Sequence, residues 1–194
     1  MKIQITRAGN DVTFETVSVD NTETVFFTNL DTQEAHAPTL ATNQVGAAPS
    51  ANSSPSPLPA PPNVNPPYVV VYGCKLPGHE AEQGIINVFA PLAEANTTLK
   101  ANVGQATNQQ VANGGAPPYT ITDLFVNSNV PVPGSSSQPG QTLPLAPGVV
   151  LSQDAGGISV VGTPTQAGTY NFTFTVNDSM GRNLQQVQYS LTVS

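Results

Sequence analysis

The sequence predicts an all-β protein made of two β-sandwich units. Only 9% of its residues are charged. Most of the uncharged residues are Thr, Ser, Asn, Gln, Val, Gly and Pro. β-Branched residues suit strands, whereas Gly, Pro and Asn suit turns. Apolar residues recur at a spacing of two, and no segment combines apolar 3.6-residue spacing with a charged opposite face. A length of 194 residues accommodates one large domain or two small ones.

Residues 1–40 contain the first group of expected strands. Apolar and polar residues alternate there, so that one side of each strand can face a core. Asn10-Asp11 and Asp20-Asn21 are turn signals that separate the strands. The apolar pairs at a spacing of two are Ile3 and Ile5, Val12 and Phe14, Val17 and Val19, and Val25 and Phe27.

The segment 41–67 has a different composition. Eight prolines fall between Pro49 and Pro67, and no charged residue occurs between Ala35 and Cys74. We therefore predict a Pro-rich insertion that forms an extended, polyproline-like surface loop rather than part of a sheet. A docking surface beside a functional site is the alternative interpretation.

The rest of the chain returns to strand-like patterns. Pro91 to Asn96 separates two groups of them and indicates a domain boundary. We expect a first domain at residues 1–94, which includes the insertion 41–67, and a second domain at 95–194. The clearest later strands are 68–72, 84–89, 170–176 and 187–193.

The charge distribution excludes several functional classes. The net charge is −7, and the chain has no basic stripe of the kind that binds nucleic acid. No apolar run approaches the roughly 18 residues that span a membrane. Met1-Lys2-Ile3-Gln4 leads directly into strand-like alternation, so we expect no signal peptide in this sequence.

One cysteine and two histidines form the most informative set of residues. A single cysteine allows no intrachain disulfide. His36 follows a strand-like segment, whereas Cys74 and His79 share one short loop after another strand. A thiolate and two imidazoles form the trigonal plane of a type-1 copper site, which has a weak ligand on its axis. We therefore predict that His36, Cys74 and His79 bind one copper ion. A buried cysteine with two unrelated surface histidines is the alternative.

Residues 1–90 resemble the cupredoxins, apart from the Pro-rich insertion. Phe27-Thr-Asn-Leu-Asp31, followed by His36, resembles the strand before the first histidine ligand of that family. Cys74-Lys-Leu-Pro-Gly-His79 resembles the azurin form of the ligand loop, and Gly84-Ile-Ile-Asn-Val88 resembles the closing strand. The resemblance implies a Greek-key β-sandwich that carries a blue-copper site.

The sequence departs from the cupredoxin pattern at two positions. Many family members have an axial methionine, but neither methionine of this chain lies in the loop. One family spacing places Glu82 at the axial position, and the other places Gln83 there. We favour Gln83, because glutamine is the axial ligand of the similar stellacyanins; Glu82, or neither residue, is the alternative. Ala37 replaces the asparagine that follows the first histidine, so a hydrogen bond to the thiolate is absent or comes from elsewhere.

Residues 95–194 resemble the immunoglobulin-like domains of bacterial surface proteins. Gly114-Gly-Ala-Pro-Pro-Tyr119 and Gly162-Thr-Pro-Thr-Gln-Ala-Gly-Thr-Tyr170 carry most of the resemblance. Such domains mostly serve as spacers or adhesive modules. Asp154 and Asp178 could suggest calcium, but no further carboxylates cluster with them in the sequence. We expect these two aspartates to stabilise turns.

The function predicted from these features is one-electron transfer with an unidentified redox partner protein. The expected setting is extracellular or periplasmic. An enzyme is not expected, because catalytic copper sites need more histidines than the two that are already used. The alternatives are a copper carrier that does not transfer electrons, and a structural or adhesive protein that associates with itself or with a cell surface.

Overall fold

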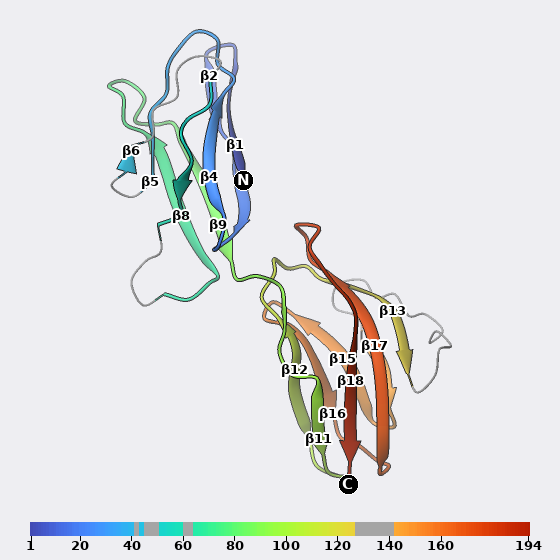
Figure 1. Ribbon diagram of the computed structural model, residues 1–194. Coiled ribbons are helices and arrows are strands. Elements are labelled where there is room, and N and C mark those ends of the chain that lie inside the picture. Colours follow the sequence, from blue (N-terminus) through green and yellow to red (C-terminus); the bar gives the residue numbers. More distant parts are fainter. Residues whose placement is uncertain (41–42, 45–50, 60–63, 127–141) are drawn as a thin grey trace. The chain divides into compact units, whose positions relative to one another are not determined.

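The computed structural model describes residues 1–40, 43–44, 51–59, 64–126 and 142–194 (Figure 1). Every regular element in these ranges is a β-strand, so the predicted all-β class is confirmed. No helix long and apolar enough to cross a membrane occurs in the part of the chain described here. The chain divides into two compact units, Met1–Pro91 and Leu92–Ser194.

The first unit is a sandwich of a four-stranded and a five-stranded sheet, with strand orders β2-β1-β4-β7 and β3-β9-β8-β5-β6. The chain crosses repeatedly between the two sheets, as expected for Greek-key connections. The strands are β1 (Lys2–Ala8), β2 (Asp11–Phe14), β3 (Val17–Asp20), β4 (Thr24–Asn29), β5 (Pro38–Leu40), β6 (Asn43–Gln44), β7 (Ser56–Pro57), β8 (Tyr68–Cys74) and β9 (Gln83–Phe89).

Alternation along these strands builds the first core. β1 pairs in parallel with β4, with Ile3 opposite Phe27. Both side chains are fully buried, as are Ile86 and Val88 of β9 in the other sheet. Successive residues of a strand point to opposite faces. Spacing-two apolar residues therefore fill the space between the sheets and hold the strand ends in fixed positions.

The Pro-rich segment 41–67 forms more sheet than we predicted. In its described part, β6 pairs with β5, and β7 pairs with β4 at the edge of the first sheet. Ser53 Oγ accepts a hydrogen bond from the Phe27 N–H at 2.9 Å. The prediction of a loop without sheet is therefore wrong for β6 and β7. The backbone groups on this edge of β4 would otherwise lack hydrogen-bond partners in the sheet, and β7 supplies them. Residues 41–42, 45–50 and 60–63 lie outside the described part.

The second unit is also a sandwich of two sheets, with strand orders β10-β12-β16-β15-β14 and β11-β18-β17-β13. It begins before residue 95, because β10 pairs with β12. The strands are β10 (Ala93–Glu94), β11 (Thr98–Ala101), β12 (Thr107–Asn113), β13 (Thr120–Val126), β14 (Leu143–Ala146), β15 (Val149–Asp154), β16 (Gly157–Gly162), β17 (Gly168–Asn177) and β18 (Asn183–Val193).

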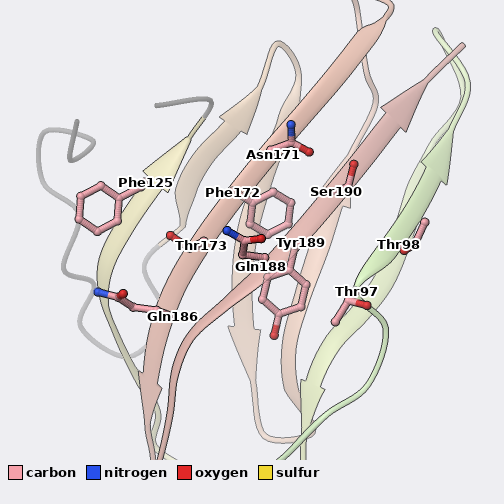
Figure 2. Close-up of a pocket in the computed structure, with 10 residues that line it drawn as sticks. All are labelled: Thr97, Thr98, Phe125, Asn171, Phe172, Thr173, Gln186, Gln188, Tyr189 and Ser190. Carbon is pink, nitrogen blue, oxygen red and sulfur yellow. The ribbon is translucent and has the colours of Figure 1, made fainter. Parts of the chain in front are cut away.

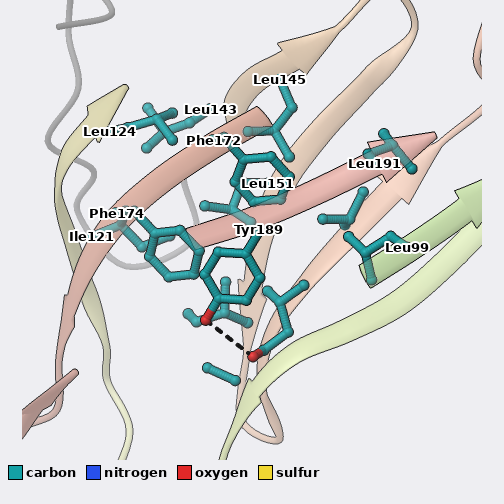
Figure 3. Close-up of a cluster of buried hydrophobic side chains, with 14 of the residues drawn as sticks. Leu99, Ile121, Leu124, Leu143, Leu145, Leu151, Phe172, Phe174, Tyr189 and Leu191 are labelled. Carbon is teal, nitrogen blue, oxygen red and sulfur yellow. Dashed lines mark hydrogen bonds between the residues drawn. The ribbon is translucent and has the colours of Figure 1, made fainter. Parts of the chain in front are cut away.

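The sheet β11-β18-β17-β13 has two chemically different faces. Its outer face carries hydroxyl and carboxamide side chains, among them Thr173 and Gln188 (Figure 2). Its inner face carries Phe172, Phe174 and Tyr189, whose rings stack at interplanar angles of 12–14° (Figure 3). The Tyr189 hydroxyl donates a hydrogen bond to the Val111 carbonyl oxygen at 3.3 Å. That bond satisfies the one polar atom that this aromatic stack buries.

Candidate metal centre

Three neighbouring parts of the first unit bring four potential ligands together. His36 lies between β4 and β5, Cys74 is the last residue of β8, and His79 and Glu82 lie in the loop from β8 to β9. β5 pairs with β8, with Pro38 opposite Cys74. The histidine is thereby carried next to the cysteine. The four ligand atoms all lie within 4.8 Å of one another.

Backbone hydrogen bonds shape the ligand loop. The Glu82 N–H donates to the His79 carbonyl oxygen at 3.0 Å, and the His79 N–H donates to the Leu76 carbonyl oxygen at 3.1 Å. The Cys74 N–H donates to the Glu82 carbonyl oxygen at 3.0 Å and closes the loop. Gly78 has a φ of 88°, a conformation that side chains with a Cβ rarely adopt. This turn places His79 and Glu82 on the same side of the loop.

The Glu82 carboxylate lies between the two histidines. Its Oε2 is 3.0 Å from His36 Nδ1, and its Oε1 is 2.9 Å from His79 Nδ1. The two imidazole rings lie 5.3 Å apart with an interplanar angle of 74°. Both Nδ1 atoms therefore point toward one small volume, which the Cys74 sulfur also borders.

The opposite edge of the His36 ring is held by Asp31. His36 Nε2 is 3.0 Å from Asp31 Oδ2, and the same oxygen accepts a hydrogen bond from Arg7 Nε at 2.8 Å. Asp31 Oδ1 accepts a bond from the Gln33 N–H at 2.8 Å. Burial by itself would raise the pKa of Asp31, but these hydrogen bonds outweigh it and hold the pKa well below its usual range. A carboxylate that accepts a hydrogen bond from the Nε2–H group keeps the proton on Nε2 and leaves Nδ1 as the ligand atom.

The donor set fits a metal cation. Carboxylate oxygens only accept hydrogen bonds, and they face both nitrogens of His36, Nδ1 through Glu82 and Nε2 through Asp31. A cation at Nδ1 would take the place that a proton occupies in such a contact. Two imidazoles, one thiolate and one carboxylate are ligands for copper and also for zinc.

The Cys74 sulfur has a hydrogen-bond donor despite the unusual residue after His36. The Ala37 N–H donates to Cys74 Sγ at 3.3 Å. The second possibility raised by the sequence therefore holds: the bond comes from elsewhere, namely from the backbone. Cys74 and His36 are almost fully buried, at 2% and 1% exposure. A buried sulfur with one N–H donor is restrained in position and shielded from water.

The structure does not bring Gln83 into this group. Gln83 is the first residue of β9, where it pairs with Gly73, and its side chain is exposed. Glu82, one residue earlier, is still in the loop and turns inward. The geometry therefore favours Glu82 over Gln83 as the fourth ligand. The physical reason is the start of the strand, which reverses the direction of the side chain between successive residues.

Sequence reasoning missed the residues that surround the ligands. The sequence marks Asp31 only as part of a resemblance, and no sequence pattern connects Arg7 with it. Phe14 packs edge-on against the His36 ring, with centroids 5.7 Å apart. Glu34 lies beside the partly exposed His79, with 3.9 Å between Glu34 Oε2 and His79 Nε2. The Asp31–His36 spacing was the one available signal, because a carboxylate close to a ligand histidine is a common supporting partner.

The aspartates considered for calcium have turn-stabilising contacts. Asp154 Oδ1 accepts a hydrogen bond from the Gly156 N–H at 2.7 Å. Asp178 Oδ1 accepts bonds from the N–H groups of Met180 and Arg182, each at 2.9 Å. These contacts agree with the expected turn role.

Comparisons with known proteins give only distant similarities. No protein-family model matches the chain, and no curated protein sequence matches it. Immunoglobulin domains 1–4 of Sidekick-1 are 13% identical at a TM-score of 0.39, and the match covers 93% of this chain and 47% of that one. This chain thus spans about half the length of the Sidekick-1 structure.

Two copper proteins are also among the similar solved structures. A multicopper oxidase is 10% identical at a TM-score of 0.31, with 100% of this chain and 88% of that chain covered. The copper-containing nitrite reductase of Thermus scotoductus SA-01 is 12% identical at a TM-score of 0.29, with 100% and 61% covered. At these values the matches do not assign the chain to a family.

Proposed function

We propose that the first unit holds a mononuclear type-1 copper site and transfers single electrons in an extracytoplasmic setting. The convergence of His36 Nδ1, Cys74 Sγ, His79 Nδ1 and a Glu82 oxygen within 4.8 Å carries this proposal. Copper in such a site alternates between two oxidation states. The chain's own contribution is to keep the ligands nearly fixed, because reorganisation slows electron exchange.

The rigidity of the proposed site has three sources. Asp31 fixes the His36 ring from its far edge. The Ala37 N–H restrains the thiolate of Cys74. The backbone bond from Cys74 to Glu82 closes the ligand loop. Each contact comes from a strand or a short loop, and sites on such elements are more precise than sites on long loops.

Glu82 is the proposed fourth ligand. A carboxylate is a harder donor than the thioether that occupies this position in many type-1 sites, and it carries a negative charge. It stabilises copper(II) relative to copper(I), so we propose a low reduction potential. The same donor set also suits tetrahedral zinc, so competition between copper and zinc tests the proposed metal.

His79 is the proposed entry point for electrons. Its side chain is 18% exposed, whereas the His36 side chain has no exposure. Glu34 is exposed and lies close to His79 in space, and Glu80 is exposed and follows His79 in the sequence. The proposed partner is therefore a protein with a positively charged contact surface.

Protein-film voltammetry of the copper-loaded chain tests the function directly. A reversible one-electron wave with fast self-exchange in solution supports electron transfer. Stable copper binding without a reversible wave would instead support a copper carrier. Preferential retention of zinc over copper, under equal supply of both ions, would contradict the proposed site.

A further inference from the structure

A wide groove lies on the outer face of the sheet β11-β18-β17-β13 in the second unit, separate from the metal centre. It has a volume of about 980 Å³, near the upper end of the range typical of ligand sites. Figure 2 shows the residues around it, which come from β13, β17 and β18, from Thr98 at the start of β11 and from Thr97 just before that strand. The residues around it are Thr97, Thr98, Phe125, Asn171, Phe172, Thr173, Gln186, Gln188, Tyr189 and Ser190. The side chains of Phe172 and Tyr189 belong to the inner face and are buried in the core, so the outer face is formed by the other eight.

The strand register arranges the lining residues in two rows across the sheet. Phe125 lies opposite Thr173, which lies opposite Gln188. Asn171 lies opposite Ser190, which lies opposite Thr98. Neighbouring strands are about 4.8 Å apart. Each row therefore offers hydroxyl or carboxamide groups at regular intervals, and the first row ends at an aromatic ring.

Two backbone irregularities border this groove. Asp123 has a φ of 54° and Gln186 a φ of 46°, and they are the only non-glycine residues with positive φ in the described parts of the chain. Each lies in a register shift, one between β13 and β17 and the other between β17 and β18. The two bulges flank the same part of β17. Bulges redirect side chains, and strained backbone of this kind concentrates at binding sites.

The chemistry of the lining selects the class of ligand. None of the lining side chains in the described part of the chain carries a charge, so these side chains offer no ion-pair partner to an anion or a cation. Nucleic acid is disfavoured because none of the described lining residues is a lysine or arginine that could meet its phosphates. Extended peptides bind mainly through the backbone of a sheet edge, whereas this groove offers side chains on a sheet face.

We propose that this groove binds a neutral oligosaccharide. A pyranose ring has C–H groups on its faces, which fit against the half-buried Phe125 ring. Its hydroxyls both donate and accept hydrogen bonds, as do the carboxamides of Gln186 and Gln188 and the hydroxyls of Thr173 and Ser190. The volume of the groove accommodates several sugar units rather than one.

Calorimetry on the full chain tests this proposal with cellohexaose, xylohexaose, mannohexaose and maltohexaose, and with hexagalacturonate as a charged comparison. Binding of at least one neutral hexasaccharide is expected, with amide shift changes at Thr173, Gln188 and Ser190 in NMR spectra. Q188A should weaken binding about 2- to 10-fold through lost hydrogen bonds. F125L, which keeps apolar bulk without the ring, should weaken it by a similar factor.

Gln166 provides the matched control, because it is an exposed glutamine outside the groove. Q166A should bind like the unsubstituted chain. Three results would overturn the proposal: no binding of any neutral hexasaccharide at millimolar concentration, tighter binding of hexagalacturonate, or equal affinity in Q188A, F125L and Q166A. The thermal unfolding of each variant is measured first, and T173A replaces any variant that does not fold.

Discussion

Replacing Asp31 by asparagine tests whether Asp31 positions the first histidine ligand, His36. Asp31 Oδ2 receives hydrogen bonds from both Arg7 Nε and His36 Nε2, at 2.8 and 3.0 Å. An asparagine that keeps its oxygen toward the Gln33 N–H would turn its NH₂ group toward these two donors. The His36 ring would then lose the partner that keeps the proton on Nε2 and frees Nδ1.

The expected magnitude follows from the burial of this contact. Loss of a supporting partner of a ligand histidine typically lowers metal affinity about 10- to 100-fold, or about 1.4–2.7 kcal/mol. Asp31 is only 1% exposed, so water cannot replace the lost acceptor. We therefore expect the loss of copper affinity to lie near the upper end of this range. The metal-free D31N variant should also be less stable by about 2–3 kcal/mol, because hydrogen bonds to a buried charge are lost.

Competition titration against a copper chelator measures the affinity, and urea unfolding of the metal-free chain measures the stability. Glu34→Gln is the matched control: Glu34 contacts the same Arg7, but its side chain is 50% exposed. An exposed pair of this kind contributes little, so E34Q should resemble the unsubstituted chain in both assays. Equal copper affinity in D31N and E34Q would refute the positioning role of Asp31.

Three further predictions follow from other contacts. Glu82→Gln should raise the reduction potential, because it removes a negative charge that stabilises copper(II), whereas Gln83→Ala should leave it nearly unchanged; voltammetry of both variants decides. Burial alone would raise the pKa of Asp178, but hydrogen bonds from backbone N–H groups and an arginine hold it below its ordinary value. Its folded-state pKa is therefore lower than its unfolded one, so this contribution to stability is present above about pH 3.9 and is lost as pH falls further. Asp178→Asn should lower the stability at pH 7 by about 1–3 kcal/mol and flatten that acid dependence in urea unfolding; an unchanged acid slope would contradict it. Residues 1–91 alone should fold and bind copper, because all four ligands lie in this compact unit; circular dichroism that shows an unfolded fragment would contradict it.

Local patterns predicted much of the first unit. The spacing-two residues Ile3, Ile5, Val25 and Phe27 are fully buried in the core, because alternation is a direct consequence of strand geometry. The candidate ligands His36, Cys74 and His79 were found by residue type and by the position of the loop. The structure places them together because the pairing of β5 with β8 carries His36 to the end of the cysteine strand.

Other features depended on contacts that no local pattern specifies. The choice between Glu82 and Gln83 turns on the residue at which β9 begins, and strand ends are poorly defined by sequence. Arg7 reaches Asp31 only because β1 lies beside β4 in the folded sheet. The prolines around Ser56 suggested a loop, yet this short segment pairs with the edge of β4. Proline is tolerated at such an edge position.

Titration of the metal-free chain with copper(II), followed by visible absorption, tests the central claim most directly. One equivalent should produce an intense band from charge transfer between the Cys74 thiolate and copper. The same titration of Cys74→Ser should give no such band, although Glu82 and both histidines remain. A colourless protein after one equivalent, or an equally intense band in C74S, would contradict the proposed copper site.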